Sequence, residues 1–260
     1  MKKCMLSVFA LLILASVVYA QGNTPVAVSG FNHDVVATGT GLAEPSTTIS
    51  FDHSGPDNNH VFYVEGFDSG EYGLPADGKI ISDANPKNTY QLAAYDDSNS
   101  LLISGTGSGS LYLKQPSKFS SIFFLAASSH GHSLVSVTLN YTDGTSNEVL
   151  TGLSLPDWFD NEPNVAIQEL GRVKRHDNNF DDRYPNPKLF EFEISGIDPE
   201  LVLESITFDK AATSSDAKAG IFAVSGKKIP PPIPLSGFII PLVLLLMISF
   251  LSIVYHKVRF

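Results

Sequence analysis

The side chains best suited to binding chemistry lie in one short segment around the single tryptophan of the chain. Asp157 precedes Trp158, and Phe159, Asp160 and Asn161 follow it. An aromatic ring can stack on the C–H face of a sugar, while carboxylates and amides hydrogen-bond its hydroxyls. The segment therefore predicts a ligand site formed by Trp158, Asp157, Asp160 and Asn161. The alternative is that Trp158 closes one end of a hydrophobic core.

A second polar segment has the spacing of a calcium loop. Asp177, Asn179 and Asp181 occupy alternate positions, which suits oxygen ligation of calcium, the one cofactor that the sequence suggests. The twelfth position, where an EF-hand has glutamate, is Lys188. Basic residues surround the segment, so a solvated loop of neutralising ion pairs is the alternative interpretation.

Catalytic motifs are missing from the sequence, and a non-enzymatic protein is expected. His130 and His132 could supply two zinc ligands, whereas catalytic zinc takes three from the protein. Their glycine and serine neighbours indicate an exposed loop. The glycine-rich segment 105–109 stands between two expected strands, not between a strand and a helix as a serine-nucleophile elbow would.

The charge balance of the body excludes some partners. Four of the 17 basic residues lie in the terminal segments, so the body has 13 basic and 27 acidic residues, a net charge of −14. Such a surface repels nucleic acid, and no nucleic-acid partner is expected. The only cysteine, Cys4, lies near the N-terminus, so the rest of the chain has no disulfide.

Residues 21–228 show the pattern of an all-β domain. Short runs of alternating apolar and polar residues recur between turn residues, and no helical period lasts more than a turn or two. The run 121–127 is apolar on both faces, as a central strand would be. One antiparallel β-sandwich is expected, with 21–50 as an N-terminal strand segment packed on it. The expected strands are 61–64, 100–104, 110–113, 121–127, 134–141, 148–155, 189–194, 203–208 and 219–225.

Turn residues predict how some of these strands connect. The glycine-rich segment 105–109 is expected to join 100–104 to 110–113 as a hairpin. Thr142-Asp143-Gly144-Thr145 is expected to turn 134–141 back into 148–155, because Asp-Gly adopts the positive φ angles of a tight turn.

The two ends of the chain carry apolar runs that predict export and tethering. Residues 1–20 have the basic, apolar and small-residue parts of a signal peptide. Residues 235–255 carry no charge and reach about 30 Å as a helix, enough to span a membrane. Lys257 and Arg259 follow this run, so 256–260 is expected to be a cytoplasmic tail. The proline-rich segment 229–234 is expected to be a stalk, and the body to lie on the extracellular face.

The C-terminal segment resembles the sorting tails of bacterial surface proteins. The segment Pro232-Ile233-Pro234-Leu235-Ser236-Gly237-Phe238, followed by an apolar helix and a basic end, is similar to tails read by exosortase-type transpeptidases. It departs from the usual form, since it has Pro-Ile-Pro where that form has Pro-Glu-Pro. The resemblance implies either a cleaved sorting signal or, if uncleaved, a permanent span.

The body resembles jelly-roll modules of the galactose-binding-like type. The motifs that carry this resemblance are Tyr141-Thr142-Asp143-Gly144-Thr145, Asp157-Trp158-Phe159, Ile206-Thr207-Phe208 and Ile221-Phe222-Ala223-Val224-Ser225-Gly226. Members of this group often have a structural calcium near their start. The resemblance therefore makes the loop with Asp52, Asp57, Asn58 and Asn59, flanked by His53 and His60, an alternative calcium site.

These observations lead to one expected function and two alternatives. The expected function is a membrane-anchored extracellular protein that binds carbohydrate or mediates surface adhesion, with cell-surface or extracellular polysaccharide as its partner. The alternatives are a structural envelope protein without a small ligand and a polysaccharide-active enzyme.

Overall fold

The computed structural model describes residues 22–52, 55, 59–181, 183–212 and 216–230. The expected signal peptide, membrane span, cytoplasmic tail and most of the stalk lie outside these residues. Within the described part, no helix is long and apolar enough to cross a membrane.

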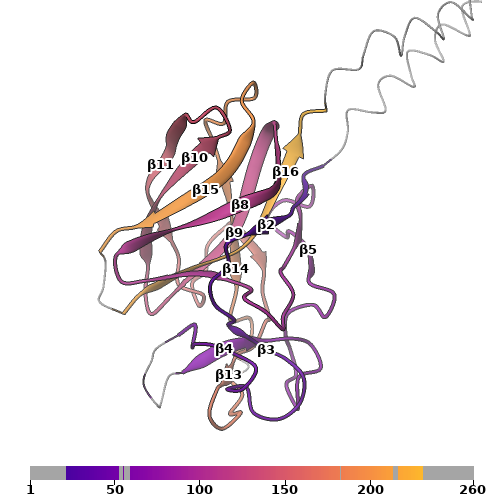
Figure 1. Ribbon diagram of the computed structural model, residues 1–260. Helices are drawn as coiled ribbons and strands as arrows, with labels where there is room; N and C mark the ends of the chain where they lie inside the picture. The colour runs from indigo at the N-terminus through magenta and orange to yellow at the C-terminus, as the bar shows by residue number, and fades with distance from the viewer. Residues whose placement is uncertain (1–21, 53–54, 56–58, 182, 213–215, 231–260) are drawn as a thin grey trace, which may run out of the picture. The chain divides into compact units, whose positions relative to one another are not determined.

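The described residues form strands connected by turns and loops, as the alternating sequence predicts (Figure 1). The strands are β1 (Thr24–Val26), β2 (Val28–Ser29), β3 (Val36–Ala37), β4 (His60–Tyr63), β5 (Lys79–Ile81), β6 (Thr89–Gln91), β7 (Leu101–Ser104), β8 (Gly107–Ser117), β9 (Phe119–Ser129), β10 (Ser133–Tyr141), β11 (Ser146–Leu155), β12 (Val165–Ile167), β13 (Val173–Lys174), β14 (Leu189–Ile194), β15 (Leu203–Lys210) and β16 (Lys218–Lys228).

Two antiparallel sheets form the sandwich. The six-stranded sheet has the order β1-β16-β9-β14-β12, with β7 also paired to β16. The five-stranded sheet has the order β11-β10-β15-β8-β2. Strand β9 lies between β16 and β14, so the expectation of a central strand at 121–127 is confirmed. The all-β, antiparallel prediction is confirmed as well.

The main core fills the space between the two sheets. Strand β10 shows how the sequence builds it, because Val135, Val137 and Leu139 alternate with more exposed residues and are fully buried. Phe124 of β9 reaches them from the opposite sheet and packs edge-on against Phe208 of β15, with ring centroids 5.1 Å apart. This interdigitation defines a sandwich.

A second core covers the outer face of the six-stranded sheet. Leu125, Ala127 and Phe222 point away from the main core and pack against long segments outside the sandwich. Those segments include the parallel pair β3–β4, the antiparallel pair β13–β4 and the hairpin β5–β6. They give this sheet a buried face on each side.

One predicted connection is wrong. Strand β7 pairs with β16, whereas β8 pairs with β15 and β2, so the segment 105–109 carries the chain from one sheet to the other instead of closing a hairpin. Gly109, inside β8, lies against Leu101, and an added Cβ there would stand 2.6 Å from a methyl group, so the Leu101 side chain would have to shift. The turn between β10 and β11 is confirmed, with Gly144 at φ 85°.

Candidate functional site

Trp158 is buried, with 1% of its surface exposed. Its ring packs edge-on against Phe51 and Phe62, each with centroids 4.9 Å away. The guanidinium of Arg172 lies 5.4 Å from the ring centroid. The expectation of an exposed aromatic platform at Trp158 is therefore corrected: the indole belongs to the second core, as the alternative interpretation proposed.

The carboxylates beside Trp158 hold two loops together. Asp157 accepts hydrogen bonds from the backbone N–H groups of Gly131 (2.8 Å) and Phe159 (3.0 Å), and burial raises the pKa of its carboxyl group. Asp160 accepts from the backbone N–H of Asp157 at 2.8 Å. The carboxylates of Asp157 and Asp160, which were expected to bind a ligand, thus accept hydrogen bonds from the protein backbone.

A buried lysine occupies the oxygen-rich centre of the same loop. The Nζ of Lys188 donates to the Asp160 carbonyl (2.9 Å), to Asn161 Oδ1 (3.0 Å) and to Asn186 Oδ1 (2.6 Å). Burial lowers the pKa of Lys188, while the charge of Asp160 opposes this shift. Asn161 therefore faces an internal ammonium group and fixes the loop.

Arginines neutralise the expected calcium loop. Both Nε and Nη2 of Arg172 donate to Asp181 Oδ2, at 3.0 and 2.7 Å, and Arg183 Nε lies 2.7 Å from Asp181 Oδ1. Burial would raise the pKa of Asp181, but the hydrogen bonds and positive charge of the two arginines lower it. Asp177 accepts from the backbone N–H of Asn179 in a local turn. The calcium expectation is corrected at Asp181, where two guanidinium groups repel a cation.

In the alternative calcium loop, Asp52 also pairs with an arginine. Asp52 Oδ2 lies 2.6 Å from Arg172 Nη1 and 3.7 Å from His60 Nδ1. Asn59 is buried, and His53, Asp57 and Asn58 lie outside the described residues. In the part of the chain that the structure describes, no group of three or more His, Cys, Asp or Glu side chains could hold a metal ion.

His130 and His132, the two candidate zinc ligands, lie in the turn between β9 and β10, and both are exposed, as expected of a loop. His132 Nδ1 lies 2.9 Å from Ser154 Oγ, and its Nε2 lies 2.8 Å from Asp160 Oδ2. This line has the residue types of a hydrolytic triad. It lies on the surface, with half of the His132 side chain exposed, and the cavity described below is lined by other segments.

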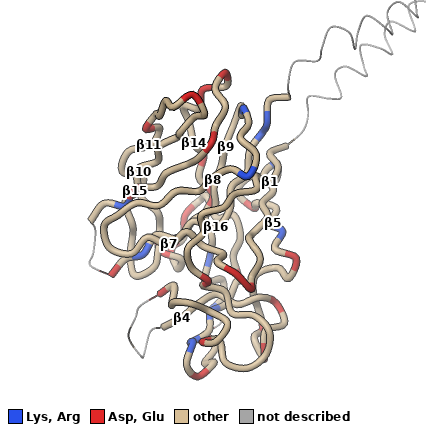
Figure 2. Tube along the Cα trace, in the orientation of Figure 1, with Lys and Arg blue, Asp and Glu red and all other residues tan. Residues whose placement is uncertain are grey.

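The outer face of the five-stranded sheet is the exposed surface that sequence analysis did not single out. Tyr112 projects from β8 with 54% of its surface exposed. Strand β10 has no charged residue, and Lys114 is the only one in β8 (Figure 2). Alternation along β8 could have revealed Tyr112, because it stands between the buried Leu111 and Leu113.

Strand register places polar side chains in rows beside Tyr112. One row crosses all five strands, because Tyr112 is opposite both Ser29 and Ser205, Ser205 is opposite Asn140, and Asn140 is opposite Ser146. With strands about 4.8 Å apart, such a row is about 19 Å long.

Hydrogen bonds fix this polar surface in place. Asn140 Nδ2 donates to Ser205 Oγ (3.1 Å) and to Thr207 Oγ1 (3.0 Å). Thr207 Oγ1 lies 2.8 Å from Ser110 Oγ. These hydrogen bonds order the side chains before any ligand binds. The side-chain oxygen Oδ1 of Asn140 can then accept a hydrogen bond from a ligand hydroxyl.

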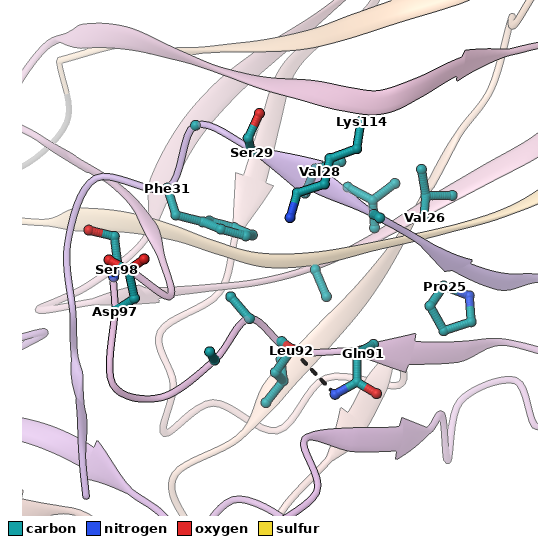
Figure 3. Close-up of a pocket in the computed structure, with 16 residues that line it drawn as sticks. Pro25, Val26, Val28, Ser29, Phe31, Gln91, Leu92, Asp97, Ser98 and Lys114 are labelled. Carbon is teal, nitrogen blue, oxygen red and sulfur yellow. Dashed lines mark hydrogen bonds between the residues drawn. The ribbon is translucent and has the colours of Figure 1, made fainter.

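A cavity of about 590 Å³ opens at one edge of the sandwich (Figure 3). The segments 25–31 and 91–98 form two of its walls, and Lys114, Ala223 and Val224 complete the lining. Lys114 is two residues from Tyr112 on β8, so the cavity adjoins the open face. The predicted site residues around Trp158 and Asp181 do not line it.

Comparison with known proteins gives no family. No family model and no curated protein matches the chain. Among solved structures, a mutant of CBM29-2 complexed with mannohexaose is similar with 14% identity and a TM-score of 0.30, over 54% of this chain and 81% of that chain.

Two further structures of carbohydrate-binding modules show the same level of similarity. A pectin-binding module has 12% identity and a TM-score of 0.26 over 52% of this chain and 75% of that chain. CpGH89CBM32-6, produced by Clostridium perfringens, has 9% identity and a TM-score of 0.27 over 50% and 77%. At these TM-scores the similarities carry no argument about what this chain binds.

Proposed function

We propose that this domain binds an extended glycan on the outer face of its five-stranded sheet and that it is not an enzyme. The observation that carries the proposal is the exposed ring of Tyr112, set among hydroxyl and amide side chains of the neighbouring strands. A tyrosine ring stacks on the apolar face of a sugar, and its edge and its neighbours bond the hydroxyl groups.

The length of the polar row, about 19 Å, favours a chain over a single sugar. The row from Ser29 to Ser146 has a polar side chain on each strand it crosses, and Ser205, which is buried, accepts a hydrogen bond from Asn140 instead of facing a ligand. A ligand lying along this row would meet Tyr112 near one end and Asn140 near the other. Both residues are held by β-structure, so little conformational entropy is lost when the ligand binds.

The sequence supports display of this face outside the cell. The segment 1–20 has the features of a signal peptide, and 235–255 those of a membrane span or a sorting tail. Together with the resemblance of the body to galactose-binding-like modules, these features favour a tethered extracellular module whose partner is a polysaccharide. The intact mass of the mature protein distinguishes a permanent span from a cleaved tail.

A glycan array followed by titration calorimetry tests the binding proposal on the full chain. For any glycan that binds the wild type, Tyr112→Ala should lower the affinity about tenfold, because an aromatic stacking contact contributes about 1–2 kcal/mol. Tyr184→Ala is the matched control, since Tyr184 is 67% exposed and lies outside this sheet. Failure of the wild type to bind any glycan, or equal affinity of the Tyr112→Ala variant, would overturn the proposal.

A further inference from the structure

The N-terminal strands cross from one sheet to the other at the cavity. Strand β1 pairs with β16 through Val26 and Val224, and strand β2 pairs with β8 through Val28 and Leu113. Ala27 stands between the two strands. The chain therefore runs along one wall of the cavity while it changes sheets (Figure 3).

Among the described strands, this wall is a sheet edge. Strand β2 is the last strand of the five-stranded sheet. The Ala27 carbonyl accepts a hydrogen bond from Lys114 N at 2.9 Å, so Ala27 belongs to a hydrogen-bonded pair of the ladder. In an antiparallel ladder the next residue turns its N–H and C=O groups away from the partner strand. By this alternation the backbone groups of Val28 point away from β8, and Val28 is one of the residues that line the cavity.

The opposite wall also presents backbone groups. Ala93 and Ala94 follow β6, and neither makes a backbone hydrogen bond with another described residue. Their side chains are small, so the backbone stays accessible from the cavity. Ala223 and Val224 contribute further apolar surface. The cavity thus combines accessible amide groups with small apolar side chains.

The size of the cavity corresponds to a short strand. One residue of a strand occupies about 3.3 Å along the chain, 4.8 Å between strands and 10 Å between layers, or about 160 Å³. A volume of about 590 Å³ therefore accommodates about four residues.

Opposite sides of the cavity carry opposite charges. Lys114 lies beside Val28, and Asp97 lies beside Ser98 and Phe31 on the opposite side of the cavity, whose lining continues past Lys114 to Val26 and Pro25 (Figure 3). Both charged side chains are exposed, and neither forms an ion pair with a described residue. A strand antiparallel to β2 would run from the Asp97 side to the Lys114 side.

We propose that this cavity binds an extended peptide segment of a partner protein as an additional antiparallel strand on β2. The peptide has small or β-branched apolar residues at its centre, a basic residue at its N-terminal end beside Asp97, and an acidic residue at its C-terminal end beside Lys114. Main-chain hydrogen bonds supply affinity in this mode of recognition, and the two charges supply direction. The cavity adjoins the open face and shares Ser29 with its polar row, but Tyr112 does not line it, and the proposal does not depend on glycan binding.

Fluorescent pentapeptides test the proposal by polarisation with the full chain. The probe is acetyl-Lys-Val-Ala-Val-Glu-amide, and its comparison is the same peptide with lysine and glutamate exchanged. The probe should bind at least threefold more tightly than the exchanged peptide, and N-methylation of its central alanine should weaken binding at least tenfold. Lys114→Glu combined with Asp97→Lys should reverse the preference between the two peptides.

Controls separate this site from other effects. Lys87→Glu changes an exposed lysine that does not line the cavity and should leave peptide binding unchanged. Tyr112→Ala should also leave it unchanged, whatever happens to glycan binding. Absence of peptide binding to the wild type at millimolar concentration, or binding that is indifferent to both N-methylation and charge order, would overturn the proposal.

Discussion

The two outer faces of the sandwich differ in what lies over them. The six-stranded sheet turns Leu125 and Phe222 outward, and the second core buries both. The five-stranded sheet turns Tyr112 and Asn140 outward, and Tyr112 remains exposed. An aromatic residue under the covering segments contributes to folding, whereas one on the open face is available to a ligand. Residue type alone does not distinguish these roles.

Trp158 and Tyr112 are the clearest pair for testing this difference. Trp158→Ala should lower the free energy of unfolding by about 4–5 kcal/mol, since it leaves a cavity among Phe51, Phe62 and Arg172. Denaturant unfolding followed by circular dichroism measures the loss. A variant of wild-type stability that lost only glycan binding would instead make Trp158 the sugar platform.

The ion pairs beneath the covering segments should matter almost as much. Arg172→Met should cost about 3–4 kcal/mol, because the buried Asp52 would lose its arginine partner and the half-buried Asp181 would keep only Arg183. Arg183→Met is the matched control, since Arg183 contacts the same Asp181 from an exposed position and should cost less than about 1 kcal/mol. Equal losses in urea titrations of the two variants would contradict a buried network.

Asp34 makes the covered side sensitive to pH. Burial raises the pKa of Asp34 to about 6, against the opposing effect of hydrogen bonds from Val36 N–H and Asn99. The folded protein therefore holds this proton more tightly than the unfolded chain. The contribution of Asp34 is most favourable below about pH 4, declines as pH rises to about 6, and is constant above.

Asp34→Asn removes this titration and keeps an oxygen that can accept both hydrogen bonds. Its stability relative to the wild type should rise by about 2–3 kcal/mol between pH 4 and pH 6.5, as measured by unfolding at each pH. A difference that is the same at every pH would show that Asp34 does not titrate in this range.

The smallest effect on stability is expected on the open face. Tyr112→Ala should change the free energy of unfolding by no more than about 0.5 kcal/mol, because the side chain is more than half exposed. Thermal unfolding of the variant beside Trp158→Ala gives the comparison directly. A loss of several kcal/mol would place Tyr112 in a packing role and remove the contrast between the faces.

Local sequence signals predicted most of the strands. The expected strand 189–194 has the same bounds as β14, and 134–141 begins one residue after β10. Period-two alternation carries this information because one side of each strand meets the core. The partner of each strand was harder to predict. Segment 105–109 has the composition of a hairpin turn, yet it joins two sheets, because pairing depends on β15 and β16 far along the chain.

The candidate site shows the same division. The sequence pointed to Asn161, Asp160 and Asp181 through their chemical types, and the fold pairs these groups internally with Lys188, His132 and Arg172, respectively. Tyr112 was not among the predicted residues, and its neighbours Ser205 and Asn140 come from strands far away in the chain. Only the register of three strands brings these residues into one row.

The sequence by itself determined the all-β class, the positions of most strands and the acidic character of the body, because these depend on composition and on the spacing of neighbouring residues. The tertiary structure decided which sheet face is covered, which carboxylates meet an internal cation and which aromatic ring stays exposed. Each of these depends on contacts between residues far apart in the chain, which local sequence preferences do not determine.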